Sequence, residues 1–395
     1  MNILFVTPRL PYPPLKGDQC IPYYRLKLLS RKHNITLLTF YQHNKELEYL
    51  KELKPFCKEI TTIKLNKLYS FFNMLIGGIF SKLPFQVLYF RSRAFKKSTQ
   101  SLVKGRRFDI VHTYMLRMAE YTKDINKPKV LDLIDLMQLN LKKRVSIEKF
   151  VRKIFFKEEL KRITRYENQM ITKYDVSILV SDNDKNHIES DKIAAVSLGI
   201  DTHIFKRYSN LPDNKTIIFS GNMGYFPNEI AVIWFIEKCF GRIKREIPDA
   251  KLVIAGNNPN SKIKKIGDNL SIFVTGYVES MASELSKAQV AITPMQSGYG
   301  MHIKILEAMA CALPVITTTS GLGVIKATHG KNVIIADDAS DFTRSCIKLL
   351  NDYGLAKKVG DNARDLVLKN YSWEMHVNKM EKIYGSIMES KREVI

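Results

Sequence analysis

Residues 218–228 read IFSGNMGYFPN: a short apolar run, a loop of small residues and the start of a helix-like segment. The same alternation of short, β-branched runs and longer helical stretches extends over the whole 395-residue chain. It is typical of parallel sheets that are covered by helices on both faces. Because domains usually hold ~100–200 residues, the sequence predicts an α/β protein with two doubly wound domains in series.

Short apolar runs are predicted to form the strands of the two sheets. In the first half of the chain they are Ile3–Val6, Ile35–Phe40, Ile60–Ile63, Ile110–His112, Val130–Asp132 and Val176–Val180. In the second half they are Thr216–Ser220, Lys251–Ala255, Ser271–Thr275, Val290–Thr293, Pro314–Thr317 and Asn332–Ile335. We place the domain boundary in the polar, turn-rich residues 207–214 (RYSNLPDN). The predicted domains are residues 1–205, joined by 371–395, and residues 206–370.

The charge of the chain is large and uneven. Its 62 Lys and Arg against 39 Asp and Glu give a net charge of +23. The first 200 residues hold 37 of the basic and 19 of the acidic residues, so most of the excess lies in the first half. A one-sided basic surface indicates a polyanionic partner, which is a nucleic acid, an anionic membrane leaflet or a phosphorylated substrate.

Cysteine and histidine spacing gives no sign of a disulfide framework or a metal site. The five cysteines are scattered and form no C-x-x-C pair, which favours free thiols in a reducing compartment. No H-x-x-x-H or H-E-x-x-H pair occurs, so we predict neither structural zinc nor a metal cofactor. The first residues, MNILFV, read as a strand without the basic start of a secretory signal. We therefore expect a cytoplasmic protein.

Residues 68–81 (LYSFFNMLIGGIFS) carry no charge over 14 positions. A helix of this length is shorter than the ~20 residues that span a bilayer. Between Lys51 and Asp109 there are 13 basic residues against three acidic ones, a setting that suits a segment lying on an anionic membrane. A buried helix followed by an edge strand at residues 83–90 is an equally weighted alternative.

A second basic segment, residues 142–165, has apolar residues at helical spacing and predicts one helix. Such a charged run is usually a solvated helix face, and contact with a membrane is the alternative. The Asp182-Asn183-Asp184 sequence follows a predicted strand, so we interpret it as a turn and helix start rather than a metal site.

Residues 298–316 (GYGMHIKILEAMACALPVI) carry the strongest chemical signal. Lys304 and Glu307 lie one helical turn apart on the same face, behind two glycines. A lysine suits a phosphate and a glutamate suits sugar hydroxyls, while a structural ion pair between them is the competing interpretation. Upstream, Gly221 can let the backbone approach a ligand and Asn222 can donate to it, or the two can simply form a tight turn.

The 298–316 motif, with its K-x-L-E-A-M-A core and the Pro-Val-Ile that follows, resembles the donor-site motif of glycosyltransferase family 4. Further matches are spread over nearly the whole chain in the family's order. They include residues 14–17, 108–112, 199–201, 220–222, 253–256, 276–278 and 371–374. The resemblance implies the GT-B fold, with two Rossmann-like domains facing a central cleft and a C-terminal helix that crosses back to the N-terminal domain.

The resemblance also implies an activity and a site. Such enzymes transfer a sugar from a nucleotide-sugar with retention of configuration, here onto a lipid-linked saccharide during synthesis of bacterial surface polysaccharide, either lipopolysaccharide or capsule. The implied donor-binding residues are Gly221, Asn222, Gly276, Tyr277, Val278, Gly298, Tyr299, Gly300, Met301, Lys304 and Glu307. The implied catalytic residues are Lys304, Glu307, Gly17, His112 and Asp135. For His112 and Asp135, a role as satisfied polar residues of the core is the alternative.

Three positions depart from the family pattern. Tyr299 stands where many members have a second glutamate, and Ile134-Asp135 stands where a His-Asp pair is common. Residues 221–233 lack the Arg and Lys that members often have there, so Lys304 is expected to be the main cation for the diphosphate. Amides and a lysine that stabilise the leaving diphosphate make a metal dispensable.

We expect the protein to be held peripherally at the inner face of the plasma membrane. Two alternatives remain open at this point. A nucleotide-sugar epimerase of the same fold would have no use for the basic, apolar first half. A basic protein that binds nucleic acid or membrane without catalysis would explain the charge, but the chain shows no nucleic-acid recognition motif. We therefore predict no nucleic-acid partner.

Overall fold

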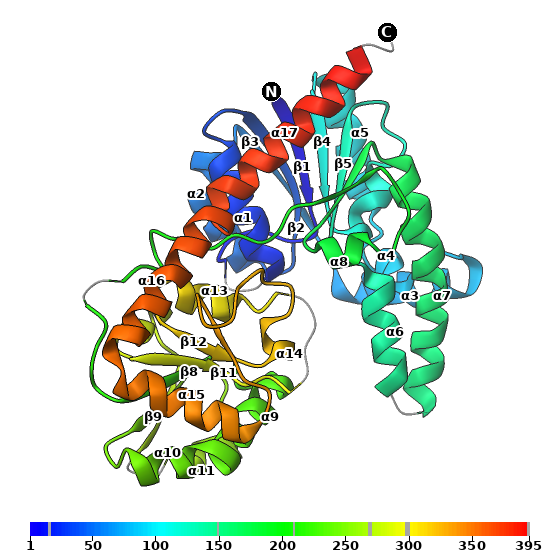
Figure 1. Ribbon diagram of the computed structural model, residues 1–395. Helices are drawn as coiled ribbons and strands as arrows, with labels where there is room; N and C mark the ends of the chain where they lie inside the picture. Colours follow the sequence, from blue (N-terminus) through cyan, green and yellow to red (C-terminus); the bar gives the residue numbers. More distant parts are fainter. Residues whose placement is uncertain (15–16, 148–149, 208–209, 268–270, 297–300, 393–395) are drawn as a thin grey trace. The chain divides into compact units, whose positions relative to one another are not determined.

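The computed structural model describes residues 1–14, 17–147, 150–207, 210–267, 271–296 and 301–392 (Figure 1). Its contacts divide the chain into two compact units. Unit 1 comprises Met1–Leu198 and His376–Ile395, and unit 2 comprises Gly199–Met375. Each unit contains one parallel sheet with associated helices, of seven strands in unit 1 and six in unit 2. The predicted α/β class with two doubly wound domains is therefore confirmed.

Unit 1 is built on a parallel sheet in the order β3-β2-β1-β4-β5-β6-β7. Its strands are β1 (Asn2–Thr7), β2 (Asn34–Tyr41), β3 (Glu59–Lys64), β4 (Ile110–Tyr114), β5 (Lys129–Ile134), β6 (Val176–Leu179) and β7 (Ile193–Ala195). The central strands β1 and β4 are almost wholly buried, as expected for a sheet covered on both faces. The sequence does not predict β7, because its three residues give too short an apolar run.

The helices of unit 1 connect these strands and extend beyond them. They are α1 (Gly17–Leu29), η1 (Asn44–Tyr49), α2 (Leu50–Leu53), η2 (Lys54–Phe56), α3 (Lys67–Phe80), α4 (Phe85–Tyr89), α5 (Arg93–Gly105), η3 (Leu116–Tyr121), α6 (Met137–Ile147), α7 (Phe150–Lys173) and α8 (Asp182–Lys185). The start of α8 at Asp182 confirms the predicted helix start there. Two antiparallel helices, α6 and α7, replace the single helix predicted over residues 142–165 (Figure 1).

Unit 2 is built on a parallel sheet in the order β10-β9-β8-β11-β12-β13. Its strands are β8 (Thr216–Ser220), β9 (Lys251–Ala255), β10 (Ile272–Gly276), β11 (Val290–Thr293), β12 (Val315–Thr317) and β13 (Ile334–Ile335). Its helices are α9 (Phe226–Phe235), η4 (Ile236–Phe240), α10 (Gly241–Glu246), α11 (Ser261–Ile266), α12 (Met281–Ser286), α13 (Ile303–Ala310), α14 (Thr319–Leu322), α15 (Ala339–Asn351) and α16 (Tyr353–Asn370). All six predicted strands of this half are found.

Each sheet has one point at which the strand order reverses. In unit 1 the chain runs outward from β1 to β3 and then returns to place β4 on the other side of β1. In unit 2 it runs from β8 to β10 and then places β11 on the other side of β8. In doubly wound sheets the loops that follow the two central strands diverge at this point, and ligands bind in the crevice between them. We therefore expect ligand sites at these two edges.

The unit boundaries differ by a few residues from the predicted ones at 205 and 370. Residues 199–205 belong to unit 2, because Ile200 pairs with Ser372 in a parallel bridge. The predicted boundary segment also begins inside unit 2, where Arg207 donates to Asp361 Oδ1 at 2.9 Å and to Ala312 O. Arg207 and residues 210–214 therefore belong to unit 2 and do not form the boundary.

The C-terminal helix α17 (Trp373–Arg392) joins unit 1 from His376 onward, which confirms the predicted return of the chain (Figure 1). Tyr384 Oη lies 2.8 Å from His112 Nδ1 on the central strand β4. Near its end, Lys391 forms an ion pair of 3.0 Å with Asp175. The last helix of the chain thus completes the core that the first strand begins.

The structure of residues 67–90 tests one of the two alternatives left open for the apolar segment, the buried helix followed by an edge strand. Both α3 and the following α4 are helices, so the predicted edge strand at 83–90 is wrong. Ser70 is the buried residue of α3, whereas its large apolar side chains are exposed, so the buried-helix interpretation is also wrong. Within the described residues, no helix is both long and apolar enough to cross a membrane.

A buried ion pair ties α1 to the centre of the unit 1 sheet. Arg25 and Asp132 are at most 1% exposed and form a direct ion pair. His112 Nε2 lies 3.4 Å from Asp132 Oδ2, and its ring stacks on Phe5 at 4.3 Å. Burial and the Arg25 charge hold the pKa of His112 well below its usual value, so the imidazole is neutral. A buried cation therefore depends on one carboxylate for its charge compensation.

Asp132→Asn is expected to lower the unfolding free energy of unit 1 by about 3–5 kcal/mol, because it leaves the Arg25 charge buried without its counter-ion. The double variant Arg25→Met/Asp132→Asn should recover part of this loss. Hydrogen exchange of the β4 amides in a urea series measures the change. The variant Lys173→Gln, which breaks the exposed Lys173–Asp124 pair of the same unit, is the control and should lower this free energy by less than about 0.5 kcal/mol. If Asp132→Asn and the control lowered the unfolding free energy equally, Asp132 would not be the counter-ion on which the buried Arg25 depends.

Candidate functional site

The loop that follows β8 begins with a glycine whose conformation suits no other residue. Gly221 has φ +151°, and its N–H donates to Ala255 O at 2.8 Å at the end of β9. A Cβ on Gly221 would lie 2.8 Å from Lys304 Nζ and 2.9 Å from Asn228 Nδ2. The absence of a side chain therefore makes room for Lys304 against the loop.

Lys304 reaches this loop from α13, which follows β11 on the other side of the reversal in strand order. Its ammonium donates to Asn228 Oδ1 at 2.6 Å and lies 4.3 Å from the centre of the Phe219 ring. Asn228 is buried, and its amide donates in turn to Asn222 O at 2.9 Å. Asn228 was not among the predicted site residues, since no local pattern reveals a hydrogen bond to a lysine 76 positions later.

Glu307 lies one turn after Lys304, and among the described residues no ion pair joins the two. Burial lowers the pKa of Lys304 to about 7, and the charge of Glu307 opposes that shift. Burial likewise raises the pKa of Glu307 to about 7. Desolvation therefore dominates both groups, and the competing interpretation of a structural ion pair fails. Two groups that titrate near neutrality at one ligand edge are typical of a functional site.

His302 is a second residue of this site that the sequence did not indicate. It is the N-cap of α13, yet its side chain caps no backbone amide. Its Nε2 is buried and has no hydrogen-bond partner among the described residues. Burial and the neighbouring Lys304 charge lower the pKa of His302 to about 4, so the ring is neutral. A buried, unpartnered ring nitrogen beside Lys304 is available to a ligand.

The end of β10 supplies a third segment at the same edge of the sheet. Gly276 has φ +67°, and its carbonyl accepts from Gly256 N at 3.1 Å. Tyr277 is 70% exposed and Val278 is half-buried, so a flat aromatic ring is presented to solvent here. Asn222 Oδ1 accepts from Gly224 N at 3.0 Å, so its oxygen shapes the β8 loop.

The structure brings together most of the predicted donor-binding residues. Those that lie at the carboxyl edge of β8, β10 and β11 are Gly221, Asn222, Gly276, Tyr277, Val278, Met301, Lys304 and Glu307. The remaining three, Gly298, Tyr299 and Gly300, fall outside the described residues. Met301, half-buried, leads directly into α13.

In unit 1 the predicted residues have different surroundings. His112 is fully buried between Phe5 and Tyr384, which argues against contact with a substrate and favours a positioning role in the core. Gly17 is the first residue of α1. Asp135 is exposed and follows Ile134, whose φ of +71° is unfavourable for a β-branched residue. Such strain at a strand end is typical of functional edges, so Asp135 stays a candidate.

Within the described residues, no group of three or more His, Cys, Asp or Glu side chains is arranged to hold a metal ion. All five cysteines are free thiols.

Residues 214–352 match the family described as Glycosyl transferases group 1. An uncharacterized 44.6 kDa protein in the cps region of Klebsiella pneumoniae is 26% identical over 98% of both chains. The N-acetyl-alpha-D-glucosaminyl L-malate synthase of Bacillus anthracis is 25% identical over 47% of this chain and 49% of its own. Residues 214–352, which match the family, contain the β8 loop and α13, the two elements that form the site.

Two solved structures resemble the fold over nearly its full length. A sucrose-phosphate synthase from Thermosynechococcus elongatus has a TM-score of 0.69 at 15% identity and covers 99% of this chain and 100% of its own. Anabaena HepE in complex with UDP and glucose has a TM-score of 0.66 at 12% identity and covers 98% and 100%. At these identities the likeness shows the fold alone, which is GT-B.

A graded series of glycine substitutions tests the packing of the site. Gly256→Ala should destabilise unit 2 most, because its Cβ would lie 2.0 Å from the backbone oxygen of Gly221 at φ +140°. Gly221→Ala should lower the unfolding free energy by about 1–3 kcal/mol, since its Cβ meets only side-chain ends that can shift. Gly241→Ala is the control, as it meets nothing within 4 Å. Thermal unfolding ranks the stabilities of the three variants. A Gly221→Ala protein as stable as Gly241→Ala would contradict the close approach of Lys304 and Asn228 to Gly221.

Proposed function

We propose that this chain, a glycosyltransferase of the GT-B fold, belongs to family 4 and transfers a sugar from a nucleotide-diphosphate sugar to a lipid-linked saccharide. The observation that carries the proposal is the placement of Lys304 beside Gly221 at the reversal of strand order in unit 2, with Glu307 one helical turn further along α13. Ligands bind doubly wound sheets in the crevice at this point. Lys304 would hold the diphosphate and Glu307 the ribose hydroxyls.

The surroundings of these two residues support a nucleotide donor. With no side chain at Gly221, a diphosphate can approach the backbone and the Lys304 ammonium together. The exposed ring of Tyr277 offers a face on which a base can stack. Anabaena HepE, which shares the fold, was solved with UDP and glucose. We take a UDP-sugar as the first donor to test.

The chemistry follows from the charge that develops on the leaving group. Departure of a nucleoside diphosphate places negative charge where the Lys304 ammonium lies, and a preorganised cation in a desolvated site lowers that barrier. The resemblance to family 4 implies retention of configuration, with the leaving phosphate accepting the proton of the acceptor. The residues at hand need no dedicated base and no metal for this route, and metal independence is part of the proposal.

The acceptor and the location are inferred from two observations. The relative that matches the whole chain lies in a cps region, which supports a role in bacterial surface polysaccharide. The excess of basic residues in the first 200 positions suits an anionic leaflet and a diphosphate-linked lipid. We therefore propose peripheral association with the inner face of the plasma membrane, and no nucleic-acid partner.

Lys304→Ala and Glu307→Ala should each lower sugar transfer by roughly 100- to 1,000-fold, because each removes a group that stabilises the bound donor or its leaving diphosphate. The assay incubates the protein with UDP- and GDP-sugars and a lipid-diphosphate saccharide, with and without chelator, and NMR of the product gives its anomeric configuration. Lys331→Ala and Glu237→Ala, at exposed positions of the same unit, are the controls.

Several outcomes would contradict this proposal. Transfer at the control rate by either site variant would refute the donor assignment. Turnover of the donor without acceptor, giving an isomeric nucleotide-sugar, would indicate an epimerase instead. No transfer and no donor hydrolysis with any donor would remove the proposed activity.

Donor affinity should be greatest near pH 7 and fall on both sides. Lys304, with its pKa lowered to about 7, loses the charge that attracts the diphosphate as the pH rises above 7. Glu307, with its pKa raised to about 7, is protonated below pH 7 and then accepts hydroxyl hydrogen bonds poorly. Each pH unit changes affinity by up to about tenfold. Calorimetry with UDP-glucose should show that Lys304→Arg removes the alkaline fall and Glu307→Gln the acidic one, and a flat wild-type profile would contradict this.

A further inference from the structure

Helix α3 presents its large apolar side chains to solvent along one continuous face. These residues recur at the three- and four-residue spacing that lines one side of a helix. They are Leu68, Phe71, Phe72, Leu75, Ile76, Ile79 and Phe80. Ile79 and Phe80 are 78% and 85% exposed. This face, called the α3 face below, is an unusual exposure of apolar area for a protein surface.

The opposite side of α3 includes two glycines that pack closely on α4. A Cβ on Gly77 would lie 2.8 Å from Leu88 Cδ2, and a Cβ on Gly78 would lie 2.6 Å from Phe85 Cε1. The helix is therefore inverted with respect to an ordinary amphipathic helix, with its small residues inward and its large apolar residues outward. An arrangement of this kind needs a second apolar phase to cover the outer face.

The helix is held rigidly in this orientation. Arg162 of α7 donates to Gly78 O at 2.9 Å and to Ser81 O at 2.7 Å, so it satisfies carbonyls at the end of α3. On the same helix, Glu159 accepts from Phe85 N at 2.7 Å at the start of α4. The α3 face thus belongs to the fixed structure of unit 1.

A cavity of about 410 Å³ opens between α3, α5 and η3, a volume within the ~300–1,000 Å³ range of ligand pockets. Tyr69 and Asn73 of α3 form one wall. Four cations are among the other lining residues, and they are Arg91, Arg93, Lys96 and Arg117. Arg93 opens the N-terminal turn of α5, where the helix dipole is positive. We call this the cationic cavity.

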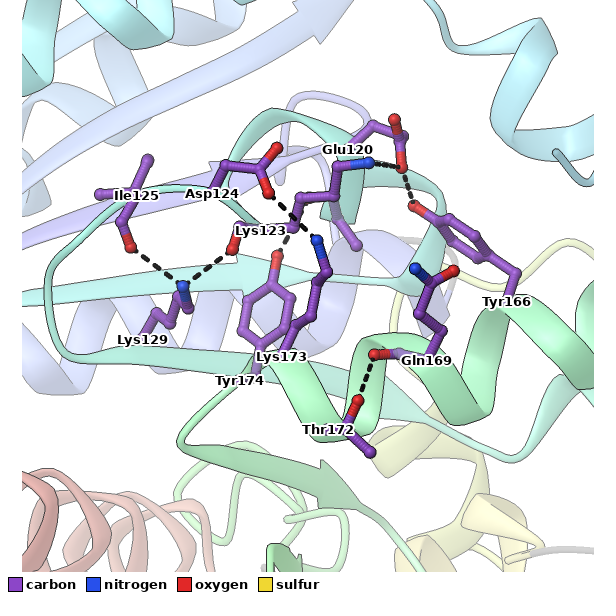
Figure 2. Close-up of polar contacts among 11 residues, drawn as sticks. Glu120, Lys123, Asp124, Ile125, Lys129, Tyr166, Gln169, Thr172, Lys173 and Tyr174 are labelled. Carbon is purple, nitrogen blue, oxygen red and sulfur yellow. Dashed lines mark hydrogen bonds and ion pairs between the residues drawn. The ribbon is translucent and has the colours of Figure 1, made fainter.

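Among the described residues, no carboxylate forms an ion pair with any of these four cations. Glu120 also lines the cavity, but its Oε1 accepts from Lys123 Nζ at 2.8 Å and from Tyr166 Oη at 2.9 Å (Figure 2). Arg117 is half-buried and lies 5.1 Å from the Phe90 ring centre, with a sulfur atom as its hydrogen-bond acceptor. The cavity therefore holds a positive charge that its own residues leave uncompensated.

We propose that unit 1 docks on an anionic membrane through the α3 face, and that the cationic cavity receives the phosphate group of a lipid. A helix of 14 residues that is apolar on its exposed face, begins at the exposed Lys67 and is followed by the exposed Lys82 suits the interface of a bilayer. Arg117 follows β4 at the reversal of strand order, so the phosphate would lie at the carboxyl edge of the unit 1 sheet. That this lipid is the sugar acceptor rests on the proposed function; the docking itself does not.

The test measures co-sedimentation of the full chain with phosphatidylcholine vesicles that contain or lack phosphatidylglycerol. The α3 variant is Phe72→Ser/Ile76→Ser/Ile79→Ser/Phe80→Ser, all at exposed positions. The cavity variant is Arg93→Gln/Lys96→Gln, and Arg117→Gln is made separately. Lys51→Gln/Lys54→Gln removes the same charge from exposed positions around α2 and is the matched control. The thermal shift with UDP-glucose serves as an independent probe of unit 2.

The α3 variant and the cavity variant should each bind phosphatidylglycerol vesicles at least tenfold more weakly than the wild type, with the control pair within about twofold. Unchanged binding by the α3 variant, or equal losses in the cavity variant and the control pair, would overturn the proposal. Stabilisation by pyrophosphate through the cavity without vesicle binding would indicate a soluble phosphate ligand and overturn the docking. Retention on duplex DNA without binding to vesicles would also overturn the docking.

The two proposals fail separately in this design. Vesicle binding without any donor-induced thermal shift would remove the proposed transfer and leave the docking in place. A donor-induced thermal shift without vesicle binding would remove the docking and leave the proposed transfer in place. The UDP-glucose shift should be equal in all the unit 1 variants, and hydrogen exchange of the β4 amides at the wild-type rate shows that unit 1 is folded in each of them.

Discussion

The reversal of strand order in each parallel sheet is the constraint on which the sites of this protein depend. In unit 2 it separates the loop after β8 from the helix after β11, and the gap between them is filled by Lys304. A glycine at 221 is required because the ammonium occupies the space of a side chain. The lysine is then held by Asn228 and the Phe219 ring, and its low proton affinity follows from the burial that this packing imposes.

The sequence predicts well what depends on local pattern. The strands of unit 2 and the helix that carries Lys304 follow from apolar periodicity and from the glycines around them. Lys304 and Gly221 could be named because a family motif marks them. Asn228 and His302 could not, since their importance arises from a hydrogen bond and a burial that exist only in three dimensions. β7 was missed because three residues carry too little pattern.

His112 and the apolar segment show where sequence reasoning reaches its limit. A histidine on a central strand has the same appearance in the sequence whether it faces a ligand or the core, and here Phe5 and Tyr384 enclose it. For α3, length and composition left burial and exposure equally weighted. Gly77 and Gly78 determine which side of the helix faces inward. They let it approach Phe85 and Leu88 closely on their side, so the large apolar side chains point outward.

The return of α17 to unit 1 has a consequence for biosynthesis. The hydrogen bond between Tyr384 and His112 joins residues 272 positions apart, so the core of unit 1 is completed only after nearly the whole chain has left the ribosome. Unit 2 is one continuous segment, Gly199–Met375, and all of its contacts are available before the unit 1 part of α17, from His376 onward, is made. Unit 2, although translated later, can thus finish folding first, whereas the core around the unit 1 sheet is completed only when α17 packs on it.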